Sequence, residues 1–264
     1  MIYYCDTDNY MTINTEQIVA YCDQLLRPEQ FKDYCPNGLQ VSGKNQVAKI
    51  VTGVTACQRL LDKAIDVNAD LILVHHGYFW KGEDQRVLSI KKNRLKTLLF
   101  NDLNLLAYHL PLDAHAEFGN NVQLAKLMDW QILSGIEGEP IGQSIVLLGE
   151  LKQSLSSSQL AAQLCKNLRR KPLHIQGHNR LIKRIAWCTG SAQSYIEKVA
   201  QYSVDAFISG EISEQTVHLA RELGVDYFAA GHHATESYGV QALGEHLAQK
   251  FDIEHQFIDI ENPV

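Results

Sequence analysis

The stretch KIVTGVTACQRLLDKAIDVNADLILVHH, residues 49–76, predicts the class of fold. Residues 49–54 are typical of a buried strand, and residues 56–67 carry apolar side chains at helical spacing. Residues 70–76 form a second apolar strand that ends in two histidines. A strand, a helix and a second strand in this order indicate a βαβ unit, which favours a mostly parallel sheet with helices on its faces. We therefore expect an α/β fold.

The same alternation continues on both sides of this stretch, interrupted by a turn-rich segment at 33–44 and a Gly- and Glu-rich loop after residue 131. The strand after that loop is expected to be antiparallel. Helices are expected at 14–27, 56–67, 89–100, 119–129, 154–168, 191–202, 213–223 and 236–250, and strands at 49–54, 70–76, 103–110, 141–151, 184–190, 205–211, 225–233 and 255–260.

Two parts of the chain resemble each other at a fixed spacing. Asp70 matches Asp205, 135 positions later, and the pair His109 and Asp113 matches His232 and Glu236, 123 positions later. Chance similarity between two βαβ units is the alternative explanation. We predict two similar α/β domains related by internal duplication, with mostly parallel or mixed sheets and a metal site in the cleft between them. The expected halves are 1–130 and 131–235, with a C-terminal helix and strand at 236–264 packing back on the first half.

Composition narrows the class of protein. The 264 residues carry a net charge of −6, which argues against nucleic acid as the main partner. No apolar run approaches the roughly 20 residues of a membrane span. The start MIYYCDTDNY lacks the pattern of a signal peptide, and we interpret it as an arm of unassigned role. The six cysteines form no CxxC pair, as expected of reduced thiols in a cytoplasmic protein.

Histidines stand at the end of the strand within 70–76. His75 and His76 are followed by Gly77, which permits the chain to turn so that both imidazoles converge. A pair of structural histidines with satisfied hydrogen bonds is the alternative. The sequence pattern therefore makes His75 and His76 candidate metal ligands without excluding a purely structural role.

His109 and Asp113 follow the next predicted strand. Pro111 disfavours a helical continuation, so we expect a stiffened loop that presents both side chains. The alternative is a loop in which Asp113 caps a helix. His115 adds an imidazole nearby, or is simply solvated.

His232, His233 and Glu236 follow a third apolar strand. If Glu236 lies in the first turn of the next helix, His232 and Glu236 share one face of that helix. A carboxylate favoured by the helix dipole is the alternative interpretation of Glu236. The sequence does not decide between His232 and His233.

Together these residues predict a metal centre. Imidazole and carboxylate ligands without thiolate suit Zn, Mn, Fe, Co or Ni and do not single one out. Five or more ligands exceed the need of one tetrahedral ion. We therefore expect two divalent ions bridged by a carboxylate, in the arrangement that activates water for hydrolysis.

Six motifs resemble a known family: VTGVTA (51–56), VHHGYFWKG (74–82), HLPLDAH (109–115), GNN (119–121), SGEISEQT (209–216) and AAGHHATE (229–236). They are similar to the GTP cyclohydrolase 1 type 2 homologs, also called the NIF-three-like family, in its short bacterial form. The resemblance extends from about Asn14 to the end of the chain, and residues 1–10 depart from it. It implies two α/β domains, a dinuclear metal site and a ring-like homohexamer. The implied metal ligands are His75, His76, Asp113, His232 and Glu236, and His109 lies beside them, either supporting a ligand or acting as an occasional ligand.

The function expected from these features is metal-dependent hydrolysis of a small molecule, such as a purine nucleotide in a cyclohydrolase-like reaction. Asp113 is the candidate bridging carboxylate, and Glu211 or Glu214 is a candidate general base unless both simply lie at an exposed helix start. Residues 78–81 (YFWK) either stack on a base and contact a phosphate, or pack on the subunit or its neighbour. The alternatives are a non-catalytic metal-binding or regulatory protein that forms a ring, and a ring that binds nucleic acid.

Overall fold

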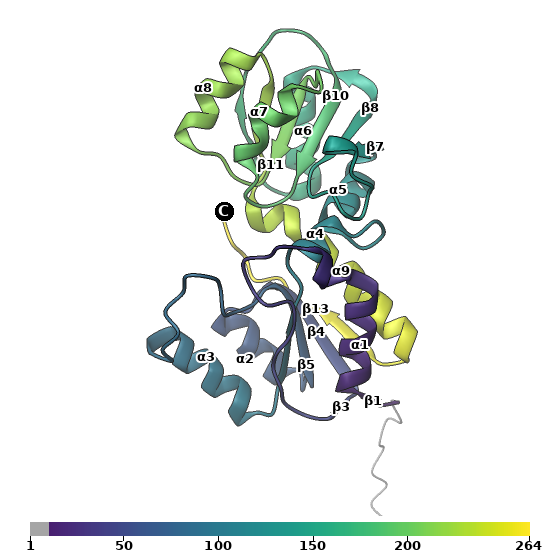
Figure 1. The fold of residues 1–264 in the computed structure, drawn as a ribbon, viewed down its shortest axis with the longest axis vertical. Coiled ribbons are helices and arrows are strands. Elements are labelled where there is room, and N and C mark those ends of the chain that lie inside the picture. The colour runs from purple at the N-terminus through teal and green to yellow at the C-terminus, as the bar shows by residue number, and fades with distance from the viewer. Residues whose placement is uncertain (1–10) are drawn as a thin grey trace, which may run out of the picture. The chain divides into compact units, whose positions relative to one another are not determined.

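The computed structural model describes residues 11–264 and divides into two compact units. Unit 1 comprises residues up to Leu25, Tyr34–Tyr108 and Leu243–Ile258. Unit 2 comprises Leu26–Asp33, His109–Ala242 and Asp259–Val264. The predicted N-terminal arm, residues 1–10, lies outside the described residues. The expected α/β fold with two domains is confirmed, because each unit is a mixed sheet accompanied by helices (Figure 1).

Unit 1 contains a five-stranded sheet in the order β13-β4-β5-β6-β2. β13, β4, β5 and β6 run parallel, and β2 pairs antiparallel with β6 at the edge. The strands are β2 (Gly38–Val41), β4 (Lys49–Thr55), β5 (Leu71–His76), β6 (Asn104–Ala107) and β13 (Glu254–Phe257), with the short pair β1 (Ile13–Asn14) and β3 (Gln46–Val47) beside them. The helices are α1 (Thr15–Leu26), α2 (Gln58–Asp66), α3 (Ser89–Phe100) and the C-terminal part of α9 (His232–Phe251).

Two glycines allow helices to approach strand β4 closely. A Cβ on Gly53 would lie 2.6 Å from the side chain of Leu60 in α2. A Cβ on Gly244 in α9 would lie 2.6 Å from the side chain of Thr52. Because successive residues of a strand point to opposite faces, Thr52 and Gly53 place α9 and α2 on opposite faces of the sheet. Strands β4 and β5 are accordingly buried on both sides along most of their length.

Unit 2 contains a six-stranded sheet in the order β7-β8-β10-β11-β12-β9. β10, β11 and β12 run parallel, while β7, β8 and β9 pair antiparallel with their neighbours. The strands are β7 (Gln131–Gly135), β8 (Leu147–Leu155), β9 (Leu173–Ile175), β10 (Ile182–Cys188), β11 (Ala206–Ser209) and β12 (Asp226–Ala229). The helices are α4 (Leu110–Ala114), α5 (Asn120–Met128), α6 (Ser157–Leu168), α7 (Ile196–Ala200), α8 (Glu214–Leu223) and the start of α9, with short 3-10 turns η1 (Pro28–Gln30), η2 (Ile136–Gly138) and η3 (Gln193–Tyr195).

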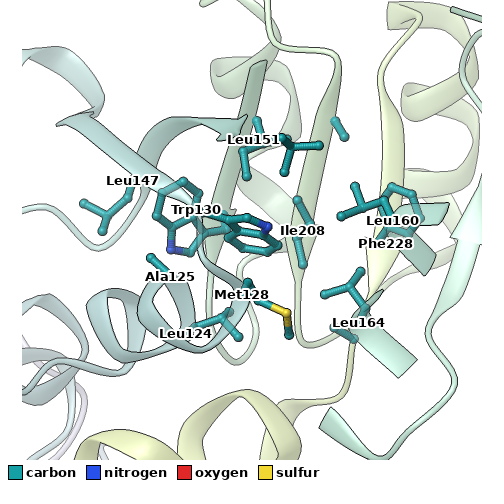
Figure 2. Close-up of a cluster of buried hydrophobic side chains, with 14 of the residues drawn as sticks. Leu124, Ala125, Met128, Trp130, Leu147, Leu151, Leu160, Leu164, Ile208 and Phe228 are labelled. Atoms are coloured by element: carbon teal, nitrogen blue, oxygen red, sulfur yellow. The ribbon is translucent and has the colours of Figure 1, made fainter. Parts of the chain in front are cut away.

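The core of unit 2 consists of two apolar clusters, one on each face of the sheet. In the cluster of Figure 2, Trp130 packs against Trp187 with ring centroids 5.3 Å apart, and α5 and α6 supply leucines. In the other cluster, Phe207 and Tyr227 pack edge to face among side chains of α7 and α8. Neighbouring residues such as Phe207 and Ile208 belong to opposite clusters, as the alternation of a strand requires.

The boundaries of the two units differ from those expected at 130 and 235. The largest segment of unit 2 begins at His109, and unit 1 includes residues 243–258 near the end of the chain. The reason is strand pairing, because β13 lies parallel to β4 and extends the sheet of unit 1. The last strand therefore returns to the sheet in the first half of the chain.

Three local expectations are corrected by the structure. The segment 33–44 contains strand β2, and the expected helix at 191–202 is a 3-10 turn followed by the short helix α7. The expected helix at 236–250 begins at His232. Among residues 11–264, none of the helices combines the length and the apolar character that crossing a membrane requires.

Candidate metal centre

Unit 1 presents two imidazoles where β5 ends. His75 is fully buried, and its Nδ1 lies 3.0 Å from the carbonyl oxygen of Tyr108. A carbonyl oxygen only accepts hydrogen bonds, so Nδ1 carries the proton and Nε2 keeps its lone pair. This is the tautomer of a histidine prepared to bind a metal through Nε2.

His76 lies beside His75 and completes the pair. Their ring centroids are 4.6 Å apart, and one nitrogen of each lies within 4.8 Å of the other. His76 Nδ1 is 3.2 Å from Thr55 Oγ1 on the neighbouring strand β4. The chain turns at Gly77, where a Cβ would lie 2.2 Å from the side-chain oxygen of Gln40. The expected convergence of the two imidazoles is therefore present in the structure.

In unit 2, Asp113 lies in the short helix α4 rather than in the predicted loop. Pro111 was expected to prevent a helix, and that expectation is wrong. Pro111 occupies the first turn, where the missing N–H has no intrahelical partner to lose and the fixed φ suits a helix. The amides of Leu112 and Asp113 then bond back to the carbonyl of His109.

The carboxylate of Asp113 is buried and held by two neutral donors. Its Oδ1 accepts hydrogen bonds from Asn120 Nδ2 at 2.9 Å and from Thr189 Oγ1 at 3.2 Å. Asn121, the next residue of α5, donates to the backbone carbonyl of Asp113 at 3.3 Å. The GNN motif thus fixes both the side chain and the backbone of Asp113.

His232 and Glu236 lie one turn apart on α9, as the spacing predicted. His232 Nε2 is 3.0 Å from Glu236 Oε2, and His232 Nδ1 is 2.7 Å from Glu211 Oε1. Burial opposes protonation of His232, but the hydrogen bonds and charges of Glu236 and Glu211 outweigh it and raise its pKa to about 9. Both ring nitrogens of His232 face carboxylate oxygens, and a neutral imidazole carries only one N–H, so one of the two contacts needs a second proton or a metal ion.

Asp113 and Glu236 are brought together in the interior of unit 2. An oxygen of each lies within 4.8 Å of the other, and both side chains are almost fully buried. Burial, followed by the charges of Asp113 and Glu236, raises the pKa of the nearby Cys188 thiol. A Cβ on Gly190 would lie 2.1 Å from Glu236 Oε1, so the residue beside this carboxylate must be glycine. Two buried carboxylates at this separation are stable only with a compensating cation or proton, so the donor set fits a divalent metal.

The remaining histidines occupy distinct places. His109 Nδ1 lies 2.6 Å from Asp33 Oδ1, and the other oxygen of Asp33 accepts from the amide of Leu110. Asp33 orients His109 as Glu211 orients His232, a role that the sequence could not reveal across 76 residues. His233 instead lies 2.8 Å from Asp259, and the amides of Glu117 and Phe118 donate to His115.

The two candidate general bases also differ in their surroundings. Glu211 contacts His232 through its Oε1, as described above. Glu214 is exposed in the first turn of α8, a position that the helix dipole favours for a carboxylate. His75 and His76 of unit 1, and Asp113, His232 and Glu236 of unit 2, each belong to a group of side chains that could hold a metal ion.

Fold and side chains together define a class: a protein of two α/β units that carry imidazole and carboxylate groups able to hold a metal ion. Residues 13–263 match the family model Duf34/NIF3 (NGG1p interacting factor 3), and the chain belongs to this family.

Relatives of this chain include a GTP cyclohydrolase 1 type 2 homolog of Pseudomonas aeruginosa, 54% identical over 96% of this chain and 100% of the relative. A protein of the same name from Escherichia coli K12 is 50% identical over 95% of this chain and 99% of its own length. Among solved structures, the protein TTHA1606 from Thermus thermophilus is 33% identical, covers 96% of this chain and 100% of its own, and has a TM-score of 0.86. The resemblance inferred from the six sequence motifs is thereby confirmed.

Proposed function

We propose that the protein binds two divalent transition-metal ions and hydrolyses a small molecule at that centre. The ligands proposed are His75, His76, Asp113, His232 and Glu236. The observation that carries the proposal is that Glu236 in unit 2 lies close both to Asp113 and to His232, where buried negative charge requires a compensating cation. A pair of bound divalent ions would supply Lewis acidity and lower the pKa of a coordinated water.

The protein's own residues would keep the ligands in position. The Tyr108 carbonyl holds the proton of His75 on Nδ1 and directs the lone pair to Nε2. Asn120 and Thr189 donate to Asp113 Oδ1 and would hold this ligand in position. Glu211 would orient His232 through Nδ1, so we propose it as a positioning residue, with general-base catalysis by Glu211 or Glu214 as the alternative.

The substrate proposed is a purine nucleotide, in a cyclohydrolase-like reaction. Support comes from relatives that carry the name GTP cyclohydrolase 1 type 2 homolog and match this chain over nearly their whole length. Nitrogen and oxygen ligands without thiolate are compatible with hydrolytic metal centres. They differ from the thiolate ligands of a metal-storage site.

A second candidate is a metal-binding or regulatory protein without catalysis. Deep burial of the ligands favours it, because His75 is 0% exposed and Glu236 is 2% exposed. Such ligands would hold a metal firmly while leaving little room for a substrate. A centre that keeps its metal through dialysis but turns over no nucleotide would support this candidate.

The test is metal content by elemental analysis on the dialysed full chain, followed by GTP turnover with the metal found. We expect about two equivalents per chain. His75→Ala and Glu236→Ala should each lose at least one equivalent, whereas His218→Ala, on the exposed face of α8, should lose none. Full metal retention in both ligand variants would contradict the proposed ligand set.

We also propose that the chain works as a cytoplasmic homohexamer. The family resemblance supports the assembly, and Cys22, Cys57, Cys165 and Cys188, which are free thiols in the described part of the chain, support a reducing compartment. Light scattering on the purified protein should give a mass near six chains. A monomer at micromolar concentration would contradict the hexamer.

A further inference from the structure

A turn rich in aromatic residues follows the histidine pair in unit 1. It contains Tyr78, which is buried, Phe79, which is 37% exposed, and Trp80, which is half-buried. The ring centroid of Trp80 lies 6.0 Å from that of the proposed ligand His76. The metal proposal assigns no role to Phe79 or Trp80, so the position of Trp80 beside His76 and the conformation of Phe79 need a separate explanation.

Hydrogen bonds hold the backbone of this turn at several points. Gln40 accepts from the amide of Tyr78 at 2.7 Å and donates to the Tyr78 carbonyl at 3.1 Å. The amide of Trp80 donates to Glu83 at 3.0 Å, and Glu83 pairs with Lys91 at 2.9 Å. The turn is therefore a preorganised element rather than a loose connection.

Phe79 adopts a backbone conformation that its side chain disfavours. Its φ is 64°, in the left-handed region that suits glycine. The other non-glycine residues with positive φ in residues 11–264 are all polar: Arg27, Asn68, Ser89, Asp102, Asp129, Glu137, Arg169, Ser203 and Asp252. The ring of Phe79 reaches solvent, and the ammonium of Lys91 lies 5.2 Å from the centroid of that ring. Burial in the core therefore does not explain this exception. Strained backbone of this kind is concentrated at sites that bind ligands.

The indole of Trp80 is fixed by its own hydrogen bond. Its Nε1 donates to the carbonyl of Gly77 at 3.2 Å, which holds the ring plane next to His76. A ring fixed in this way offers a flat apolar surface, and every heteroaromatic base has a π-face that stacks on such a surface. Sugars and open-chain substrates lack that face.

We propose that Phe79 and Trp80 form an aromatic platform that stacks on the flat heteroaromatic ring of the substrate beside His76. This inference deepens the proposed hydrolase function and rests on it. It makes Phe79 and Trp80 specificity-determining residues that select a ring-containing small molecule.

The test is equilibrium binding of three probes to the metal-loaded full chain by calorimetry: GTP, guanosine and inorganic triphosphate. Trp80→Leu and Phe79→Leu should each weaken binding of GTP and guanosine about tenfold, because stacking of one base is worth roughly that factor or more. Binding of triphosphate should stay unchanged. Trp80→Phe keeps an aromatic face and should stay within about threefold of the parent protein.

Two controls separate stacking from damage to the fold. Phe100→Leu removes an exposed aromatic ring of α3, 84% exposed, and should change no binding constant. Metal content and circular dichroism of Trp80→Leu should match the parent protein.

Specific outcomes overturn the platform. These are guanosine binding that is equal in Trp80→Leu and the parent, no guanosine binding by the parent, or equal losses for guanosine and triphosphate.

A change of oligomer mass in Trp80→Leu with unchanged guanosine binding would assign the turn to a subunit contact instead. Guanosine binding through Trp80 without GTP turnover would support the platform and contradict the hydrolase. GTP turnover with an unchanged KM in Trp80→Leu would support the hydrolase and contradict the platform.

Discussion

Units 1 and 2 share one framework and differ at the ends of their strands. Three parallel strands, β4-β5-β6 in unit 1 and β10-β11-β12 in unit 2, are each followed by an antiparallel edge strand, β2 or β9. On the opposite side the units diverge, because β13 is parallel to β4 whereas β8 is antiparallel to β10. The shared order supports the internal duplication inferred from sequence.

Equivalent aspartates make the same backbone hydrogen bonds in the two units. Asp70 accepts from the amides of residues 48 and 49, and Asp205 accepts from those of residues 183 and 184. Each aspartate therefore ties the start of one parallel strand to the next. Bonds of this kind at positions 135 apart indicate common construction of the two units.

The same comparison shows where the units have separated. Strand β5 ends in His75 and His76, whereas β11 is followed by Gly210 and Glu211. Unit 1 thus presents imidazoles after its second parallel strand, and unit 2 presents a carboxylate that orients an imidazole. Duplication preserved the backbone frame while the residues at the strand ends took different chemical roles.

The largest expected loss of stability comes from substituting two equivalent glycines, Gly43 and Gly177. A Cβ would lie 2.2 Å from the Asp102 carbonyl oxygen at Gly43, and 2.4 Å from the Val225 carbonyl oxygen at Gly177. Because backbone atoms cannot move aside, Gly43→Ala and Gly177→Ala should each lower the free energy of unfolding by about 3 kcal/mol. Urea unfolding measures both. A cost at only one of the two positions would break the equivalence of the units.

The next effect concerns a residue that differs between the units. Asn104 in unit 1 accepts from the amide of Gly43, and Asp226 in unit 2 accepts from that of Gly177. Burial alone would raise the pKa of Asp226, but hydrogen bonds from His174, Ser157 and two backbone amides outweigh it and lower that pKa below its usual range.

We expect Asp226→Asn to lower the free energy of unfolding by about 2 kcal/mol at pH 7, where the carboxylate is charged and fully bonded. The folded pKa of Asp226 is lowered, so its contribution is present above the unfolded pKa of about 3.9 and lost as pH falls below it. The difference between the parent and Asp226→Asn should therefore shrink between pH 5 and pH 3. A difference that stays constant with pH would contradict the charged state of Asp226.

A third prediction concerns Glu211, the carboxylate that orients His232 in unit 2. Glu211→Gln removes the negative charge that holds the Nδ1 proton of His232 and should weaken metal binding by about 10- to 100-fold. Metal titration measures the effect, and Glu214→Gln, on the exposed start of α8, is the matched control. If Glu211 were instead a general base, Glu211→Gln would lose turnover at unchanged metal affinity.

The smallest effect is expected for the paired surface cations. Lys44 lies 2.7 Å from Asp70, and Arg180 lies 3.0 Å from Asp205, but both cations are largely solvated. Lys44→Ala and Arg180→Ala should each change the free energy of unfolding by at most about 1 kcal/mol. Thermal unfolding at low and high salt checks this, and a loss above about 2 kcal/mol at either position would show that the cation is part of the shared framework.

Much of the fold could be predicted because its signals are local. The apolar runs of β4 and β5 and the periodicity of α1, α2 and α6 are visible within windows of about 12 residues. The edge strands β2 and β9 were not predicted, because they are short, partly exposed and flanked by turn residues. Helix α4 escaped because Pro111 was judged as a breaker, although at a first helical turn it is compatible with the helix.

The sequence by itself determined the α/β class, the duplication and the set of candidate ligands, because each depends on neighbours along the chain. Only the tertiary structure brought Asp113 to Glu236 and placed His233 beside Asp259. It also decided that Asp33 orients His109 and that Glu211 orients His232. These assignments depend on contacts between distant residues, and hydrogen-bond geometry across such distances is set by packing rather than by local pattern.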